Sequence, residues 1–257
     1  MTRERVLLVD GTNIVMRCAF GGHVPAERAI PIAAGMITRA VCETRAAFLI
    51  VAFDAPPSWR GKENPDYKAH RTTKTAPFVV AATEDFSARG WHCAASPEFE
   101  ADDVIATIVA RGKGRLEFAV LSGDSDLLAL VDTRCTVLRP ESGSAFSTLQ
   151  ADDVVAKFGV RPEQLADYKG LVGEPGDHIA GVPGIGPKTA VRLLAQHRCV
   201  NAILVAGGLG ATDPDVMRVC EHRVGVWRAL RLTTLRRDVP LHPIAPASCW
   251  VGREVAA

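Results

Sequence analysis

The chain has 257 residues, of which 47% are hydrophobic and 23% are charged, with 30 Lys and Arg against 29 Asp and Glu. These proportions are those of a globular protein with a sizeable core, and they exclude a largely disordered chain. Only four apolar residues separate the charged amino terminus from Asp10, too few for a signal peptide, and no apolar run is long enough to span a membrane. We therefore expect a cytoplasmic protein that has no membrane partner.

Neither the net charge nor the cysteines identify a function. A net charge of +1 leaves nucleic-acid binding open, because it averages over local basic and acidic patches. The 7 cysteines are widely spaced and include no C-x-x-C pair, which argues against a zinc site or redox chemistry.

The first half of the chain alternates strand-like and helical segments. Short apolar runs at residues 6–9, 48–53 and 116–121 predict buried strands. Residues 30–47 and 101–110 predict helices between them. This alternation predicts an α/β fold with a mostly parallel central sheet flanked by helices.

Composition and the positions of glycine and proline residues predict the domain organisation. We assign residues 1–146 to the α/β core and expect residues 55–97, which are rich in charge and proline and then weakly helical, to form a flexible arch-like segment of that core. A second, helical lobe is expected over residues 147–241, and residues 242–257 carry prolines and little periodicity, which is typical of a tail. The helices predicted in the lobe cover residues 147–158, 161–172 and 187–197.

Acidic residues follow the predicted strands where each apolar run ends. Asp10 and Asp54 come directly after strands, and Asp124 and Asp126 straddle one serine after the third strand. Because ligands of open α/β sheets bind at the carboxyl ends of the strands, these carboxylates are expected to converge. A single aspartate is more often a helix cap or a turn former, so the prediction depends on the joint pattern.

Converging carboxylates predict divalent metal ions. Like charges at close range would raise each other's pKa and take up protons unless a counter-ion is present. Mg²⁺ and Mn²⁺ prefer oxygen ligands, and a pair of such ions roughly 3.5 to 4 Å apart can hydrolyse a phosphodiester. Glu100 and Asp103 share one face at the start of a predicted helix, where the alternative is a simple N-terminal cap.

A glycine-rich turn precedes the predicted helix at 187–197. Gly184 and Gly186 allow a phosphate to approach the backbone closely, the helix N-terminus presents amide groups, and Lys188 adds a positive charge. Pro187 distinguishes the turn from a P-loop, because it removes one of the cradle's donors. The alternative is an ordinary connection between two helices.

Seven motifs in this order resemble the bacterial 5′ nucleases of the flap-endonuclease superfamily, which include the amino-terminal 5′-3′ exonuclease domain of DNA polymerase I. The motifs span most of the chain, and their joint occurrence is far more specific than any one of them. They are Leu7-Leu-Val-Asp-Gly11, Met16-Arg-Cys18, Phe53-Asp54, Tyr67-Lys-Ala-His-Arg71, Glu100-Ala-Asp-Asp103, Gly123-Asp-Ser-Asp126 and Gly181-Val-Pro-Gly-Ile-Gly-Pro-Lys-Thr-Ala190.

The resemblance implies a PIN-like nuclease core, a carboxyl-terminal helix-three-turn-helix lobe and roles for individual residues. Carbonyl groups of Gly181, Val182 and Ile185 would hold K⁺ against a DNA backbone. Lys68 would contact the scissile phosphate, with Arg71 and Arg17 beside it. The DNA-binding turn would comprise Gly184, Gly186, Lys188 and Thr189. The metal ligands implied are Asp10, Asp54, Glu100, Asp102, Asp103, Asp124, Asp126, Glu174 and Asp177.

One motif departs from the family pattern. Where the family reads Gly-Asp-Ser-Ser-Asp-Asn-Ile-Pro, this chain reads Gly-Glu-Pro-Gly-Asp-His-Ile-Ala over residues 173–180. Glu174 therefore replaces an aspartate, and its longer side chain can reach a metal directly or through water, which leaves the metal preference open. His178 replaces an asparagine and is either a phosphate contact or a structural residue.

The leading hypothesis is a structure-specific 5′ nuclease that cuts DNA at 5′ flaps, nicks or branches by a two-metal mechanism, as flap endonuclease and 5′-3′ exonuclease, in replication and repair. We expect a free-standing nuclease, because the chain ends soon after residue 241, and we expect it to be a monomer. Two alternatives remain. One is a PIN-type ribonuclease, which the turn at Gly184 disfavours, and the other is a catalytically inactive protein that binds branched DNA.

Overall fold

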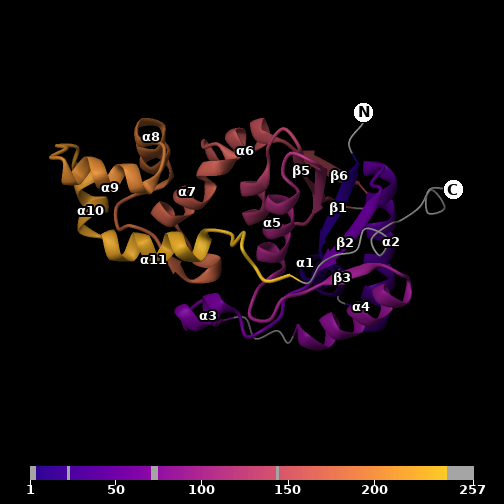
Figure 1. Cartoon of the computed structure of the whole chain (residues 1–257). Helices are drawn as coiled ribbons and strands as arrows, with labels where there is room; N and C mark the ends of the chain where they lie inside the picture. Colours follow the sequence, from indigo (N-terminus) through magenta and orange to yellow (C-terminus); the bar gives the residue numbers. More distant parts are fainter. Residues whose placement is uncertain (1–3, 22–23, 71–74, 143–144, 242–257) are drawn as a thin grey trace. The chain divides into compact units, whose positions relative to one another are not determined.

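The computed structural model describes residues 4–21, 24–70, 75–142 and 145–241. The contacts among these residues divide the chain into two compact units. The first unit contains the described residues of Met1–Trp59, Thr72–Leu149 and Arg236–Ala257, and the second contains those of Arg60–Arg71 and Gln150–Leu235. Figure 1 shows the chain coloured along the sequence, so that the first unit is mostly indigo and magenta and the second is mostly orange and yellow.

A six-stranded sheet forms the centre of the first unit, in the order β3-β2-β1-β4-β5-β6. The first five strands in this order pair in parallel, and β6 pairs antiparallel to β5. This confirms the predicted α/β fold with a mostly parallel sheet. The strands are β1 (Arg5–Asp10), β2 (Phe48–Ala52), β3 (His92–Ala94), β4 (Glu117–Leu121), β5 (Cys135–Pro140) and β6 (Phe146–Leu149).

The strand register brings three carboxyl ends to one edge of the sheet. Asp10 at the end of β1 lies opposite Ala52 at the end of β2, and Val9 lies opposite Leu121 at the end of β4. The segments that follow β1, β2 and β4 therefore start side by side at this edge. Because β1 and β4 are central strands buried on both faces, they consist of nearly continuous apolar runs.

Helices cover both faces of this sheet. The helices of the first unit are α1 (Gly11–Gly21), α2 (Ala26–Thr44), α4 (Ala76–Ala88) and α5 (Ala101–Gly112), followed by the short 3₁₀ helix η1 (Asp126–Leu130). Leu7 and Val9 of β1 pack in one core with residues of α1, α2 and α4, including Ile37. Burying a side chain such as Ile37 stabilises the fold by about 2 kcal/mol. Figure 1 shows α5 on the opposite side of β1 from α2, where Val104 and Ile105 of α5 are buried.

The segment from Arg236 on completes the first unit. The Arg236 backbone N–H donates to Asp103 Oδ1 at 2.8 Å, and the Val239 N–H donates to Thr107 Oγ1 at 3.2 Å. Val239 is fully buried, and the Ser96 hydroxyl donates to the Pro240 carbonyl at 2.7 Å. These contacts fix the end of the described chain along α5 and the strand edge. The predicted tail at residues 242–257 lies outside the described residues.

The prediction of one helix over residues 147–158 is wrong in its first part. Phe146–Leu149 forms β6, in which Ser147 lies opposite Arg139 and Thr148 lies opposite Leu138 of β5. The helix α6 begins only at Ala151, after a capping box formed by Gln150 and Asp153. Pairing with a neighbouring strand therefore overrides the weak helical pattern of these residues.

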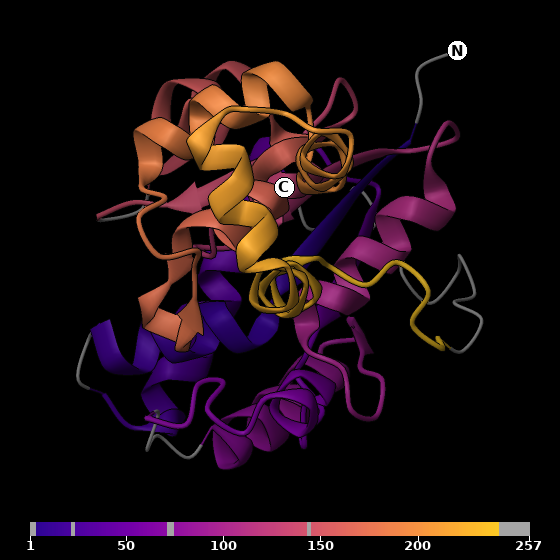
Figure 2. The same cartoon turned by 90° about the vertical axis from the view of Figure 1, so that its left-hand side faces the viewer.

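The second unit is helical apart from a small two-stranded antiparallel sheet. Its core includes Leu171, Val182, Ile185, Leu193 and Ile203. Figure 2 shows its last helices in orange and yellow, some along their axes and some from the side. The elements are α6 (Ala151–Phe158), η2 (Pro162–Gln164), α7 (Leu165–Val172), β7 (Gly173–Glu174), η3 (Pro175–Asp177), β8 (Ile179–Ala180), α8 (Pro187–His197), α9 (Val200–Gly208), α10 (Pro214–Glu221) and α11 (Arg223–Thr233).

Arg60–Arg71, which includes most of α3 (Trp59–Glu63), groups with the second unit. The buried Arg60 guanidinium donates from Nε to the Leu232 carbonyl of α11 at 2.9 Å. Tyr67 packs in a small cluster with Ile179 and Leu232. These contacts explain why the segment belongs to the second unit, although the other residues of that unit lie far away in sequence. An arch formed by residues 55–97 stays a prediction.

None of the helices in the described part of the chain combines the length and the apolar character that crossing a bilayer requires.

Candidate active site and nucleic-acid-binding turn

A chain of hydrogen bonds joins the carboxylates at the ends of β1 and β4. Asp10 is 5% exposed, and its Oδ1 accepts from the Asn13 N–H at 3.0 Å while its Oδ2 accepts from the Ser122 hydroxyl at 2.9 Å. The Ser122 oxygen accepts in turn from the Asp124 N–H at 3.0 Å, and Asp124 Oδ1 accepts from the Asp126 N–H at 2.9 Å. The fold therefore brings Asp10, Asp124 and Asp126 into one network.

Asn13 and Ser122 were not singled out from the sequence, yet they hold this network together. Asn13 Oδ1 also accepts from the Gly123 N–H at 2.9 Å, which ties the start of α1 to the loop after β4. The only signal in the sequence was their position, since each lies within three residues of a predicted metal ligand.

Asp54 connects the end of β2 to the start of α5. Its Oδ1 accepts from the Ala101 N–H at 2.8 Å, and its own N–H donates to Thr12 Oγ1 at 3.0 Å. A carboxylate at a helix N-terminus is stabilised by the free amide groups and by the helix dipole. Glu100, which precedes α5, accepts from the Ser58 hydroxyl at 2.6 Å. The first turn of α5 is therefore the second source of acidic groups in this unit.

Asp103 has both carboxylate oxygens in hydrogen bonds within the protein. The residue is fully buried, and its Oδ2 accepts from Trp59 Nε1 at 2.8 Å while its Oδ1 accepts from the Arg236 N–H at 2.8 Å. Asp102, which precedes it, is 8% exposed. The carboxylate of Asp103 thus holds the indole of Trp59 and the chain at Arg236 against α5.

The electrostatics of the cluster appear in the titration of Asp10. Burial, followed by the negative charge of Asp54, raises the pKa of Asp10 from its ordinary value of 3.8 to about 7. The Asn13 N–H and the Ser122 hydroxyl lower it, and the charge of Asp124 raises it further. A carboxylate that stays protonated up to neutral pH for these reasons lies in a site where a bound cation would be stabilised strongly.

The predicted basic residues fall in different parts of the fold. The exposed Arg17 donates from Nη2 to the Pro140 carbonyl at 2.9 Å, within the first unit. Lys68 belongs to the second unit, where its N–H donates to the Asp177 carbonyl at 3.2 Å and its ammonium group lies 4.7 Å from the centre of the Tyr67 ring. Arg71 lies outside the described residues.

The two remaining acidic residues of the predicted set, Glu174 and Asp177, lie in the second unit. Asp177 is 7% exposed at the end of η3. Glu174 accepts from the ammonium group of the buried Lys169 at 2.8 Å. Lys169 was not identified from the sequence, because a lysine within a helical pattern is typical of an exposed surface.

The glycine-rich turn packs its apolar side chains inward and leaves its backbone outside. Val182 and Ile185 are buried, and the Ile185 N–H donates to the Val182 carbonyl at 3.0 Å. Gly184 has a φ of 79°, which favours glycine, and α8 begins at Pro187 directly after Gly186. Lys188, in the first turn of α8, is exposed. The turn therefore presents its backbone and one lysine to the solvent, as a phosphate-binding turn requires.

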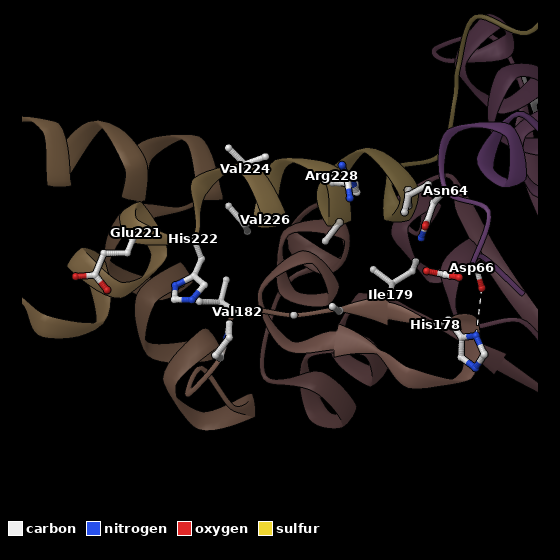
Figure 3. A pocket seen from close by; sticks show the side chains of 16 residues that line it. Asn64, Asp66, His178, Ile179, Val182, Glu221, His222, Val224, Val226 and Arg228 are labelled. Carbon is white, nitrogen blue, oxygen red and sulfur yellow. Dashed lines mark hydrogen bonds between the residues drawn. The ribbon is translucent and has the colours of Figure 1, made fainter.

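A cavity of about 380 Å³ lies behind this turn, between the residues around β8 and α11. Figure 3 shows Asp66 and His178 at one end, joined by a hydrogen bond of 3.2 Å from His178 Nδ1 to the Asp66 carbonyl oxygen, and Glu221 at the other. Val182 contributes to its apolar wall. The lining carries acidic groups, Asp66 and Glu221, and a basic one, Arg228, so its charge is mixed.

Both halves of the chain match models of known protein families. Residues 5–159 match the model described as 5′-3′ exonuclease, N-terminal resolvase-like domain, and residues 160–249 match 5′-3′ exonuclease, C-terminal SAM fold. The chain is 31% identical over 261 residues to DNA polymerase I of Mycobacterium bovis and 33% identical over 250 residues to the thermostable DNA polymerase I of Thermus filiformis. Each alignment covers 93% of this chain but only 28% and 29% of those polymerases.

Solved structures show the same fold. A zinc-bound 5′-exonuclease of bacteriophage T5 superposes with a TM-score of 0.77 at 20% identity, over 90% of each chain. The catalytic core of Rad2 in complex with a DNA substrate superposes with a TM-score of 0.57 at 13% identity, over 93% of this chain and 80% of that one.

Proposed function

This chain belongs to the 5′-3′ exonuclease family, and from that premise we propose that it hydrolyses phosphodiester bonds of DNA at 5′ flaps, nicks and branches, as flap endonuclease and 5′-3′ exonuclease. The observation that carries the proposal is the carboxylate network at the ends of β1 and β4, in which burial and then the charges of Asp54 and Asp124 raise the pKa of Asp10. The family's role in DNA metabolism supports a place in replication and repair.

The donor set fits divalent metal ions. The acidic groups around Asp10 offer only oxygen atoms, which suits Mg²⁺ or Mn²⁺. Burial and the charge of Asp54 raise the pKa of Asp10, and a bound cation would oppose both effects by stabilising the ionised carboxylate. Bound ions would supply a hydroxide and neutralise charge on the reacting phosphate. The T5 relative is a protein solved with divalent zinc. In the first unit the proposed ligands are Asp10, Asp54, Glu100, Asp102, Asp124 and Asp126.

Three predicted ligands need separate treatment. Both oxygens of Asp103 accept hydrogen bonds from Trp59 and Arg236, so we assign it a positioning role for α5. Glu174 and Asp177 stay in the proposed set on the family resemblance. The ion pair with Lys169 neutralises part of the charge on Glu174 and favours a weaker, water-mediated contact to metal.

The chain's own residues would bind and orient the substrate. Asn13 and Ser122 hold the Asp10 carboxylate in place through their hydrogen bonds. Arg17, Lys68 and Arg71 are proposed to contact the reacting phosphate. At the turn, carbonyl groups of Gly181, Val182 and Ile185 are proposed to hold K⁺. The backbone contacts proposed for DNA are Gly184, Gly186, Lys188 and Thr189.

The double variant Asp124→Asn with Asp126→Asn tests the proposed function. It removes two carboxylate charges from the network, so cleavage of a labelled 5′ flap in Mg²⁺ or Mn²⁺ should be abolished while flap binding in Ca²⁺ persists. Asp152→Asn, which alters an exposed carboxylate in α6, is the matched control and should cleave normally. Cleavage retained by the double variant would overturn the assignment.

Two alternative functions give different results in the same assays. A PIN-type ribonuclease would cleave single-stranded RNA in preference to flap DNA. A catalytically inactive DNA-binding protein would bind the flap and cleave it in neither metal. We also propose that the protein acts as a monomer in the cytoplasm, which sedimentation and cell fractionation would test.

A further inference from the structure

We propose that Arg218 of α10 is a further contact for a DNA phosphate at the turn around Gly184, held in place by an ion-pair relay that links α10 to α8. The inference rests on the proposed DNA binding of this turn. It adds a residue that lies 34 positions after Gly184 and belongs to none of the motifs of the family resemblance.

The side chain of Arg218 lies flat against the exposed backbone of the turn. A Cβ atom added to Gly184 would lie 3.3 Å from both Cδ and Nη1 of Arg218 and 3.4 Å from its Cζ. The guanidinium group thus covers the Cα of Gly184, the residue at which the backbone adopts its left-handed conformation. A DNA strand bound at the Gly184 backbone would therefore lie close to the guanidinium group of Arg218.

A relay of ion pairs fixes the position of Arg218. Its Nη1 donates to Asp215 Oδ1 at 3.0 Å, and Asp215 Oδ2 accepts from Arg192 Nη2 at 2.7 Å. Arg192 Nη1 donates to Asp213 Oδ2 at 2.6 Å. Asp213 also caps α10, because its Oδ1 accepts from the Asp215 N–H at 2.8 Å. Arg192 lies in α8, the helix that begins directly after the turn, so the relay joins the two helices that border Gly184.

The relay has different consequences for its two arginines. Arg192 uses both terminal nitrogens on carboxylates, which makes it a structural link. Arg218 donates one hydrogen bond to Asp215, through Nη1, and its side chain is 41% exposed. A guanidinium group has five N–H donors. Among the described residues Asp215 accepts from one of them, so most of the N–H groups of Arg218 remain available for a phosphate.

Pre-orientation explains why the relay would matter for binding. An arginine on a surface helix normally loses side-chain entropy when it contacts a ligand, which weakens binding. Asp215 has already fixed the Arg218 side chain, so less entropy is lost on binding.

The salt dependence of DNA binding separates a phosphate contact from a purely structural role. Each phosphate neutralised by a cation contributes about 0.9 to the slope of log K against log salt concentration. We expect Arg218→Gln to bind a 5′-flap DNA in Ca²⁺ roughly tenfold more weakly at low salt, with a slope smaller by about 0.9. In Mg²⁺ its KM for the flap should rise by a similar factor while kcat stays unchanged.

Two further variants control the experiment. Arg218→Lys keeps the positive charge, so it should restore most of the slope while recovering only part of the affinity. Arg223→Gln removes an exposed arginine at the start of α11 that is not a member of the relay, and it should match the wild type in slope and affinity. Circular dichroism and thermal unfolding identify any variant that has lost its fold, and only folded variants enter the comparison.

The outcomes distinguish this inference from the proposed function. A slope for folded Arg218→Gln equal to those of the wild type and Arg223→Gln would overturn the phosphate contact and leave the nuclease assignment intact. Wild-type protein that binds flap DNA without cleaving it would overturn the nuclease assignment and leave the Arg218 comparison valid. Wild-type protein that does not bind flap DNA would overturn both.

Discussion

At the scale of single residues, the environment of Asp10 raises the pKa of its carboxyl group and links the stability of the fold to pH. Its two oxygens are held by Asn13 and Ser122, and burial together with Asp54 raises its pKa to about 7. Between pH 4 and 7 the folded, metal-free protein therefore binds more protons at this site than the unfolded chain does. By linkage, the free energy of unfolding falls as the pH rises through this window, by up to about 4 kcal/mol.

The pH dependence of stability tests this reading of Asp10. In EDTA, the midpoint of thermal unfolding should decrease between pH 5 and pH 7.5, and Asp10→Asn should remove most of that decrease because the amide does not titrate. Added Mg²⁺ should raise the midpoint more at pH 7.5 than at pH 5. An Asp10→Asn variant that keeps the full pH dependence would show that other groups dominate it.

At the scale of elements, the site depends on where helices begin. The helix α1 starts at Gly11, directly after Asp10, and α5 starts at Ala101, whose N–H binds Asp54. A Cβ atom on Gly11 would lie 2.6 Å from Phe53 Cε1 and 2.7 Å from Val51 Cγ1. Only glycine therefore lets α1 begin so close to β2, and this close approach positions Asp10 at the edge of the sheet.

The substitution Gly11→Ala should disturb this junction. The added methyl group overpacks the buried ring of Phe53, so we expect a loss of about 1 to 3 kcal/mol in the free energy of unfolding and a parallel loss of cleavage. Urea unfolding measures the first effect and the flap assay the second. A second-site change, Phe53→Leu, should recover part of the stability.

The control for this experiment is Gly21→Ala at the other end of α1, where an added Cβ meets no atom within 4 Å. It should leave stability nearly unchanged. Equal losses in Gly11→Ala and Gly21→Ala would contradict the packing argument.

The sequence predicted those elements whose pattern depends on burial alone. β1, β2 and β4 are nearly continuous apolar runs, and α8 is marked by Pro187 at its start, so their positions could be inferred. β6 could not, because its residues are half exposed and become a strand only by pairing with β5. The two-residue strands β7 and β8 are too short to show any periodicity.

The same limit applies to the candidate site. The aspartates that follow the strands stand out because each ends an apolar run. Ser122 lies 112 positions from Asp10, and nothing in the sequence connects the two, so their hydrogen bond could not be foreseen. The contacts of Lys169 and Arg218 could not be predicted either, since arginine and lysine within helical patterns usually mark solvent-exposed faces.

At the scale of the whole molecule, the first unit is assembled from separate stretches of chain. Its last stretch donates the Arg236 N–H to Asp103 and the Val239 N–H to Thr107, and it buries Val239. Without it, buried polar atoms of α5 would lose their partners, which costs about 1 to 3 kcal/mol for each group.

Truncation measures what this stretch contributes. A chain that ends at Leu235 should lose about 4 kcal/mol or more in the free energy of unfolding, from the lost burial of Val239 and the orphaned groups of α5. It should also lose flap cleavage. A chain that ends at Leu241 keeps all these contacts and should be more stable than the chain that ends at Leu235 by that amount. Equal stability of the two truncated chains would show that residues 236–241 contribute little.

This closing stretch also sets an order of events on the ribosome. Asp103 and Thr107 are translated long before the groups that donate to them, with all residues from Gln150 to Leu235 in between. At ordinary elongation rates that interval lasts on the order of ten seconds. Throughout this interval Asp103 and Thr107 of α5 lack the backbone N–H groups of Arg236 and Val239 that bind them in the complete chain.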